Sequence, residues 1–486
     1  MSSGFSRRQI LSGLFWRYGE RTCAQGVQFI VSIVIARILS PEDYGYVGLV
    51  TVFISILTVF VQSGLGNALV QKKDADEVDF SSVFFVNVAL GVLLCIVLQI
   101  VAPVIASFYQ AKELLTPVIR VLAFSLILAS INSVQNAYVS RRMIFKKFFF
   151  ATIIGTIISA FTGISAAYAG LGLWALVIQQ LTNQTIDTIV LWLTVKWRPH
   201  RIFSLQRVKG LFSYGWKILC SGLIDTIYNN MYSLIIGKFY TSEELGYYNR
   251  GKNIPNLVIT NINSSIQTVM FPAYSKVQSD LNLVKQMVQK SIRVGTYLIF
   301  PCMVGLGVVA KPLTVVLLTE KWLPAVIFMQ FCCFIYAFWP IHTANLQAIS
   351  AIGRSDIFLG LEIIKKVLGV LFLIFTLRHG LIVMMIGRCI NTVIASVLNA
   401  LPNKRLLNYS YIEQLKDIMP NLLLSFVMGL LVYAVNFLPV GYLLQLIIQI
   451  IVGISSYLGF SILFKVKGYG YVKSVLNEAK NTIRKK

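Results

Sequence analysis

Long apolar stretches recur along the whole chain and restrict it to folds in which helices cross a membrane. Each stretch can span the roughly 30 Å hydrocarbon core of a bilayer as an α-helix. Inside lipid the backbone must satisfy its own hydrogen bonds, which helices do and open strands do not. We therefore predict an all-α, polytopic membrane protein with fourteen transmembrane helices. The predicted spans cover residues 14–39, 44–68, 80–107, 114–139, 148–168, 173–195, 213–237, 253–273, 292–318, 323–349, 357–377, 381–401, 417–437 and 441–464.

Charge is scarce and unevenly distributed. Of 486 residues, 56% are hydrophobic and 13% charged, too few polar side chains for the surface of a soluble domain of this size. The 43 Lys and Arg outnumber the 19 Asp and Glu. They gather in alternate connections, such as 141–147, 196–209 and 465–486, where they set membrane orientation and do not indicate a nucleic-acid partner. The bias predicts a multi-pass protein with both termini in the cytoplasm.

The first turn between predicted spans has a second copy later in the chain. Residues 35–47 read IARILSPEDYGYV and residues 236–248 read IGKFYTSEELGYY, each residue 201 positions after its counterpart. We interpret the match as an internal repeat of a large unit. Six helices separate the copies, so helices 1–6 and 7–12 should be parallel repeats with a substrate path between them. This predicts an N-terminal lobe at 1–202, a C-terminal lobe at 203–402, and helices 13 and 14 with a basic tail at 403–486.

Helices 1 and 7, which the repeat relates, each carry a polar stripe at helical spacing that begins with a cation. Charge within a membrane span usually faces a bundle interior or cavity, so we expect these stripes to line the substrate path. The alternative is that Arg17 and Lys217 lie at the cytoplasmic interface and extend their charged ends into water. The stripe residues predicted to contact substrate are Arg17, Arg21, Gln28, Lys217 and Tyr228.

Other ionisable residues lie within predicted spans. Arg293 and Arg388 are further candidates for contact with an anionic substrate, and a cavity role for Arg388 is about as well supported as a packing role. The acids best placed to couple transport to a proton or cation gradient are Asp187, Asp225 and Glu20. For Glu20, an ion pair with Arg17 three residues away is at least as good an explanation.

Enzymatic motifs are missing from the sequence. The seven Cys form no CxxC pair, so neither a zinc site nor a disulfide framework is indicated. There is no phosphate-binding Gly-Lys loop, and three His do not support a Ser/His/Asp arrangement. We predict that the protein is not an enzyme and uses no metal or cofactor.

Five segments resemble one family of transporters. They are ARILSPEDYGYVGLVTVF (36–53), SGLGNALVQKKD (63–74), LGYYNRGKNIPNL (245–257), MFPAYSKVQSD (270–280) and LLTEKWLPA (317–325). They are similar to Wzx-type polysaccharide flippases, more narrowly to the colanic-acid exporter branch of the polysaccharide transport family, in the MOP superfamily with the MATE exporters. The family's usual Gly in a short Gly-x-x-Trp turn is replaced by Thr319, ahead of Trp322.

The resemblance implies a MATE-like fold in the bacterial inner membrane. It implies alternating-access transport of undecaprenyl-pyrophosphate-linked oligosaccharide repeat units to the outer leaflet, for exopolysaccharide, capsule or O-antigen synthesis. The implied partners are the lipid-linked oligosaccharide and membrane lipids, with a polysaccharide polymerase and a chain-length regulator as further candidates.

Three alternatives stay open at this point. A MATE-type drug exporter should have an acidic cavity, whereas this chain has more cations than acids in its spans. A flippase of another polyprenyl-linked glycan, such as the peptidoglycan precursor, would share the same features. A membrane glycosyltransferase or polymerase would need a loop domain or a catalytic acid pair.

Overall fold

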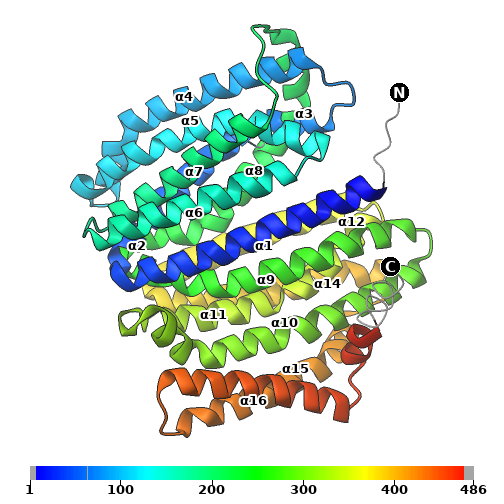
Figure 1. Ribbon diagram of the computed structural model, residues 1–486. Helices are drawn as coiled ribbons and strands as arrows, with labels where there is room; N and C mark the ends of the chain where they lie inside the picture. Colours follow the sequence, from blue (N-terminus) through cyan, green and yellow to red (C-terminus); the bar gives the residue numbers. More distant parts are fainter. Residues whose placement is uncertain (1–6, 63, 475–486) are drawn as a thin grey trace. The chain divides into compact units, whose positions relative to one another are not determined.

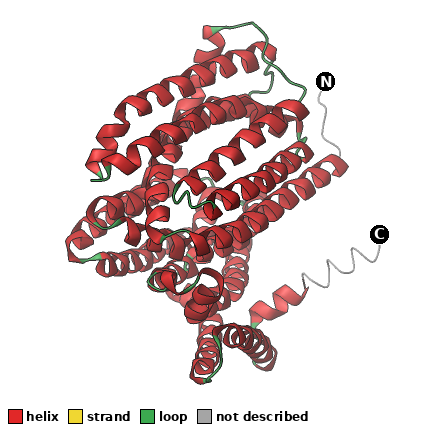
Figure 2. Ribbon diagram, turned by 60° about the vertical axis from the view of Figure 1, so that its left-hand side comes forward, coloured by secondary structure: helices red, strands yellow, loops and turns green. Residues whose placement is uncertain are grey.

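The computed structural model describes residues 7–62 and 64–474, and within these ranges every regular element is a helix (Figure 2). The α-helices, labelled in Figure 1 where there is room, are α1 (Arg7–Ile38), α2 (Pro41–Gln62), α3 (Leu65–Gln71), α4 (Glu77–Phe108), α5 (Lys112–Arg142), α6 (Lys146–Tyr168), α7 (Trp174–Thr194), α8 (Leu205–Phe239), α9 (Ser242–Lys276), α10 (Leu281–Leu318), α11 (Ala325–Ala337), α12 (Trp339–Ala351), α13 (Ser355–Thr376), α14 (Leu381–Leu406), α15 (Tyr411–Ala434) and α16 (Tyr442–Leu463). Three 3₁₀ turns lie at Glu320–Trp322, Leu377–His379 and Val435–Phe437. The predicted all-α class is confirmed.

Each predicted span corresponds to one α-helix or to two consecutive ones. The predicted span 44–68 is divided between α2 and α3, and the span 323–349 between α11 and α12. The second division has a clear cause, because Pro340 lies in the first turn of α12. Proline has no N–H to donate and its ring clashes with the carbonyl four residues earlier, so the helix has to restart at this point.

Nine helical segments in the described part of the chain are long and apolar enough to cross a membrane. Their outer faces carry apolar side chains with no protein cover, for example Ile100 (70% exposed) and Val104 (68%) of α4 and Leu443 (62%) of α16. Such faces are stable only against lipid, and the protein is a multi-pass membrane protein. The segments α7, α8, α9 and α13 do not meet this criterion, which limits both polarity and the number of charged residues, and α13 carries Glu362, Lys365 and Lys366. The count of fourteen spans stays a prediction.

The chain divides by its contacts into two compact units, Met1–Gly246 and Tyr247–Lys486. This boundary falls later than the predicted lobe boundary after residue 202, since α8 packs on α2, α3 and α4 within the first unit. A division by contacts does not test a division by sequence repeat, because helices of one repeat can pack on helices of the other. The two six-helix repeats therefore stay a prediction, and the two units are described separately below.

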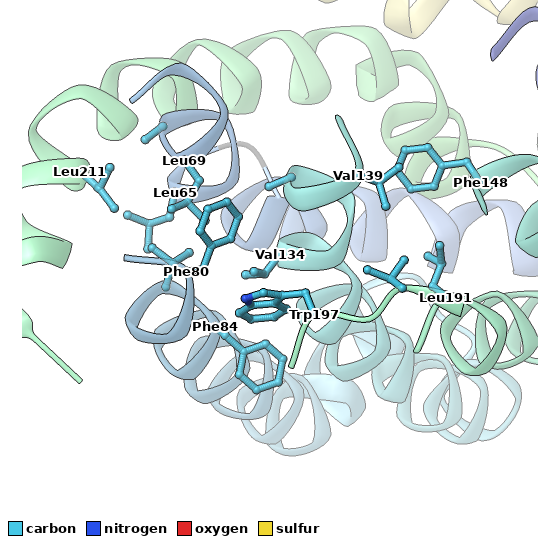
Figure 3. Packing of buried hydrophobic residues seen from close by; sticks show 14 of the residues in the cluster. Leu65, Leu69, Phe80, Phe84, Val134, Val139, Phe148, Leu191, Trp197 and Leu211 are labelled. Atoms are coloured by element: carbon cyan, nitrogen blue, oxygen red, sulfur yellow. The ribbon is translucent and has the colours of Figure 1, made fainter. Parts of the chain in front are cut away.

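Trp197, in the connection before α8, is at the centre of a hydrophobic cluster in the first unit (Figure 3). Its ring packs against Phe80 and Phe84 of α4, with centroids 5.9 and 6.1 Å away. The indole N–H donates to the Glu77 carboxylate at 2.7 Å, so the one polar atom of the ring is satisfied. Leu211 of α8 belongs to the same cluster, which fixes the first turns of α8 to the bundle.

A cluster of charged side chains lies beside this core, at the N-terminus of α4. Asp76 caps the helix and accepts a hydrogen bond from the backbone N–H of Asp79 at 3.0 Å, and this bond, followed by the charge of Arg207, holds the pKa of Asp76 below its usual range. Asp79 is fully buried and pairs with Lys72 at 2.6 Å and with Arg207 at 3.7 Å. Because Arg207 is in the first turn of α8, the same carboxylates attach α8 to α4.

In the second unit, α10 lies beside both α15 and α16 (Figure 1). Two tyrosines join α10 to α16: the Tyr297 hydroxyl bonds Ser461 at 3.0 Å, and the Tyr457 hydroxyl donates to the Tyr297 carbonyl at 2.7 Å. Their rings are in contact, with centroids 5.1 Å apart. A hydroxyl that forms a hydrogen bond between two helices inside a membrane bundle stabilises their association. These two bonds therefore hold α16 against α10.

Thr319, which replaces the glycine that the resembling family uses, has a φ of 85° and a ψ of 170°. This region is sparsely populated by residues with a side chain and is favoured by glycine. The turn it begins places Trp322, which is fully buried, against the Arg250 guanidinium at 5.8 Å and edge-on to Tyr247. The departure from the family pattern thus has a backbone cost.

We expect Thr319→Gly to raise the free energy of unfolding by about 1 kcal/mol, since relief of backbone strain exceeds the entropy that glycine adds to the unfolded chain. Thermal unfolding in detergent measures this. Thr319→Ala is the matched control, because alanine keeps the Cβ and should give no gain. Equal stability of the glycine and alanine variants would show that the turn is unstrained.

Candidate functional site

The two copies of the repeated turn fold into the same helix cap. In the first copy, Ser40 and Asp43 form a reciprocal pair: the Asp43 carboxylate accepts from the Ser40 N–H at 3.0 Å and from its hydroxyl at 2.7 Å. In the second copy, Glu244 accepts from the Thr241 N–H at 3.0 Å and from its hydroxyl at 3.1 Å. Both are capping boxes, with a hydroxyl at the cap and an acid three residues later. The repeat seen in the sequence is therefore a structural repeat at these turns.

The two copies also contact each other at their glycines. A Cβ on Gly45 would lie 1.8 Å from the backbone oxygen of Ser242, and a Cβ on Gly246 would lie 2.0 Å from the backbone oxygen of Pro41. Pro41 and Ser242 occupy the same position in the two copies, as do Gly45 and Gly246, so the contact is reciprocal. Only glycine permits so close an approach of two backbones.

In the second unit, a half-buried cationic cluster forms around Tyr248 of α9. Arg388 of α14 donates to the Tyr248 hydroxyl at 2.8 Å, and the ammonium of Lys252 lies 6.0 Å from the centre of the Tyr248 ring. Phe328 of α11 packs edge-on against the same ring. The cluster thus places a guanidinium and an ammonium, the donor groups that suit an anionic ligand, beside one phenol.

Polar side chains continue from this cluster across the same unit. Asn263 of α9 donates to the Thr343 hydroxyl of α12 at 3.0 Å, and His342 of α12 bonds Asn399 of α14 at 2.9 Å. On α13, Lys365 pairs with Glu362 at 2.5 Å, and both side chains are mostly buried. Polar side chains thus join α12 to α9 and to α14, and α13 carries an ion pair of its own.

The first unit has a polar stripe on α7. Gln180 accepts a long hydrogen bond from Thr51 of α2 at 3.4 Å, and Asn183 donates to Ser159 of α6 at 3.2 Å. Asp187, one turn further along, is half-buried where α7 crosses α6 near Gly155. Gln180 and Asn183 thus join α7 to α2 and α6, as amides and hydroxyls in membrane bundles commonly do.

The predicted site residues are distributed over several places. The side chains of Arg17, Glu20 and Arg21 lie outside the described part of the structure. Gln28 of α1 and Lys217 and Asp225 of α8 are exposed on the first unit, and Tyr228 is half-buried. In the second unit Arg293 pairs with Asp417 at 2.7 Å, whereas Arg388 belongs to the cluster at Tyr248. The assignment of these nine residues, and of Asp187, to substrate or ion binding stays a prediction.

Two members of the Tyr248 cluster were missed by sequence reasoning. Lys252 lies one residue before the predicted span 253–273, so the sequence pattern assigns it to a connection. In the structure α9 begins at Ser242, so Tyr248 and Lys252 lie one helical turn apart on the same face. The signal that could have found them is the capping box of the second repeat copy, which places the start of the helix ten residues before Lys252.

Among the residues that the structure describes, no group of three or more His, Cys, Asp or Glu side chains comes together as a metal site would require. The arrangement offers cations, hydroxyls and amides.

Solved structures with the same fold define the class of protein. A lipid II flippase MurJ in an inward closed conformation matches with a TM-score of 0.75 and 16% identity over 93% of this chain and 98% of that one. A multidrug resistance MATE family transporter of the MOP superfamily matches with a TM-score of 0.61 and 18% identity over 79% of this chain and 96% of that one. The protein thus has the fold shared by these membrane transporters.

Residues 34–327, more than half of the chain, match the family described as "Polysaccharide biosynthesis protein". The protein belongs to this family. The teichuronic acid biosynthesis protein TuaB of Bacillus subtilis is 25% identical over 475 residues, which cover 96% of this chain and 98% of TuaB. The lipopolysaccharide biosynthesis protein WzxC of Escherichia coli is 21% identical over 440 residues, which cover 87% of this chain and 88% of WzxC.

Proposed function

We propose that the protein is a flippase that moves an undecaprenyl-pyrophosphate-linked oligosaccharide from the inner to the outer leaflet of the bacterial inner membrane. The observation that carries the proposal is the cationic cluster of Arg388, Lys252 and Tyr248 in a chain that belongs to a polysaccharide biosynthesis family. TuaB and WzxC, named for the biosynthesis of teichuronic acid and lipopolysaccharide, support the glycan class of the substrate.

The main energetic barrier to such transport is the passage of the polar head group through the hydrocarbon core of the membrane. A pyrophosphate with attached sugars is charged and hydrated, and its transfer through hydrocarbon without compensation costs many kcal/mol. Guanidinium and ammonium donors replace water with charge-assisted hydrogen bonds, and bidentate contact by an arginine suits a phosphate oxygen pair. The polyprenyl chain needs no such compensation, because it stays in lipid.

The basic connections support both termini in the cytoplasm, and the head group would enter from that side. Exposure of a binding site to each side in turn, by movement of two repeats against each other, accomplishes the transfer without a covalent step. A polymerase and a chain-length regulator would act on the delivered unit and are proposed as partners.

Transport of head groups in vesicles tests the proposal. Purified protein is reconstituted with a fluorescent undecaprenyl-pyrophosphate oligosaccharide, and the outward-facing fraction is measured by a membrane-impermeant quencher. We expect protein-dependent exchange of this lipid and no uptake of ethidium, a cationic drug-exporter substrate. Exchange of ethidium with no exchange of the glycolipid would indicate a drug exporter and contradict the proposal.

The same vesicle assay with a proton ionophore or a sodium ionophore tests whether transport is coupled to a cation gradient. Asp187 and Asp225 remain the described candidates for cation coupling, so transport against a gradient should fall when the proton or the sodium gradient is collapsed. Equal rates with both gradients collapsed would remove these carboxylates from a coupling role but leave the glycolipid proposal intact.

A further inference from the structure

A pocket of about 600 Å³ lies in the second unit, where α15 meets the end of α16, and none of its lining residues belongs to the cluster at Tyr248. Its apolar lining consists of Pro420, Leu423, Leu424, Val427, Phe460, Phe464 and Val466. Its charged lining consists of Arg293, Lys416, Asp417, Lys465 and Lys467. On α15 the charged residues precede the apolar ones, and on α16 they follow them. Because these consecutive helices run in opposite directions, both place their cations at the same end of the pocket.

Of the four cations in the lining, Arg293 has a carboxylate partner, and the three lysines have none among the residues that the structure describes. Asp417 is the one carboxylate among the described residues of the lining, and its two oxygens accept hydrogen bonds from Arg293 at 2.7 Å and from the Tyr409 hydroxyl at 2.8 Å. Within the described ranges of the chain, Lys416, Lys465 and Lys467 form no ion pair. The pocket therefore combines an apolar wall with three uncompensated positive charges at one end.

Lys465 occupies a backbone position that favours glycine. The end of α16 is a Schellman motif, in which the Lys465 N–H donates to Ile462 at 3.2 Å and the Val466 N–H donates to Ser461 at 3.1 Å. Lys465 itself has a φ of 48°, in the left-handed region that residues with a Cβ adopt at a cost. Glycine would make this turn more easily, so the turn alone does not explain a lysine here.

We propose that this pocket binds one anionic phospholipid of the surrounding bilayer. Its phosphate lies among Lys416, Lys465 and Lys467, and one acyl chain follows the wall formed by α15 and α16. A soluble phosphate would leave the apolar wall unused. The chain's own residues 475–486 carry four basic side chains against one acidic one, so their charge does not complement the pocket. The site is independent of the proposed transport function.

Lipid retention tests the proposal. Full-length protein is extracted by mild detergent from vesicles of equimolar phosphatidylglycerol and phosphatidylcholine, and the lipids that remain bound are quantified by mass spectrometry. We expect phosphatidylglycerol to be enriched, and the enrichment to fall roughly fivefold for each lysine removed in Lys465→Gly and Lys467→Gln. Lys473→Gln, on the segment after α16 but outside the pocket lining, is the matched control and should retain the lipid as the parent does.

Lys465→Gly separates lipid binding from folding. Its thermal midpoint, measured without added lipid, should equal or exceed that of the parent, because glycine suits the left-handed turn. The same retention by the parent and the double variant would overturn the proposal. Displacement of phosphatidylglycerol by equimolar undecaprenyl pyrophosphate would also overturn it, because the pocket would then be a substrate site. Displacement by millimolar inorganic phosphate would overturn it as well, because the pocket would then be a simple anion site.

Discussion

Replacement of Gly45 or Gly246 by alanine is expected to lower glycolipid transport roughly tenfold or more in a protein that still folds and reaches the membrane. Each glycine brings its helix start against a backbone oxygen of the other repeat copy. A Cβ added at Gly45 would lie 1.8 Å from that oxygen, and one added at Gly246 would lie 2.0 Å from its own. An added methyl group cannot be accommodated by a side-chain rotation, since the atom that it meets is backbone. The two helix starts have to separate.

The physical reason for a large effect on transport is conformational. Alternating access requires contacts that form in one state and break in the other. A reciprocal contact between equivalent residues of two repeat copies has the geometry of such an element. Alanine would penalise the state that contains the contact by a few kcal/mol, which shifts a two-state equilibrium by one or two powers of ten.

Gly26→Ala and Gly459→Ala are the controls for this prediction. Both glycines are in helices and have nothing within 4 Å of an added Cβ. Alanine favours a helix over glycine by about 1 kcal/mol, so these variants should be as stable as the parent or more so. Parent-level transport by the Gly45→Ala, Gly246→Ala double variant would exclude a role for the contact in the transport cycle.

Replacement of Arg388 by glutamine is expected to lower transport about 10- to 100-fold, because a hydrogen bond to a charged group contributes about 1.5–3 kcal/mol. Glutamine keeps much of the side-chain length and some donor capacity but removes the charge that would meet the pyrophosphate. The vesicle exchange assay measures the rate, and protein level in the membrane is matched between variants.

Tyr248→Phe distinguishes substrate contact from packing at this position. It removes the hydroxyl that accepts the Arg388 hydrogen bond at 2.8 Å and leaves the ring and the guanidinium in place. If Arg388 binds the substrate, this variant should transport within about threefold of the parent, because a phosphate oxygen of the substrate can take the place of the lost hydroxyl as a partner of the guanidinium. A loss as large as that of Arg388→Gln would assign the pair a structural role instead.

The repeat shows how far local sequence information extends. The match between residues 35–47 and 236–248 identified two equivalent turns, and both form the same capping box. A capping box depends on residues within four positions of one another, so the sequence contains all that is needed to predict it. That Gly45 and Gly246 meet could not be read from the same pattern, because contact depends on how distant helices pack.

At the candidate site, local sequence information did not predict which side chains are buried or which partners they have. Helical spacing grouped Lys217 with Asp225 and Tyr228 on one stripe of α8, but it could not say whether that stripe is covered, and Lys217 and Asp225 are exposed. Arg293 and Arg388 looked equivalent as cations within predicted spans. The fold gives Arg293 a carboxylate partner in Asp417 and places Arg388 against the phenol of Tyr248, so the two cations have different surroundings.

The sequence by itself determined the all-helical class, the positions of the helices, the repeated turn and the family resemblance. Each of these depends on hydropathy and on interactions between residues close together in the chain. Only the tertiary structure decided which polar side chains and which backbones meet: the glycines of the two turns, the cluster at Tyr248, and the basic pocket between α15 and α16. These groups come from helices far apart in the sequence, and in a bilayer it is helix packing that decides which polar faces meet and which face lipid.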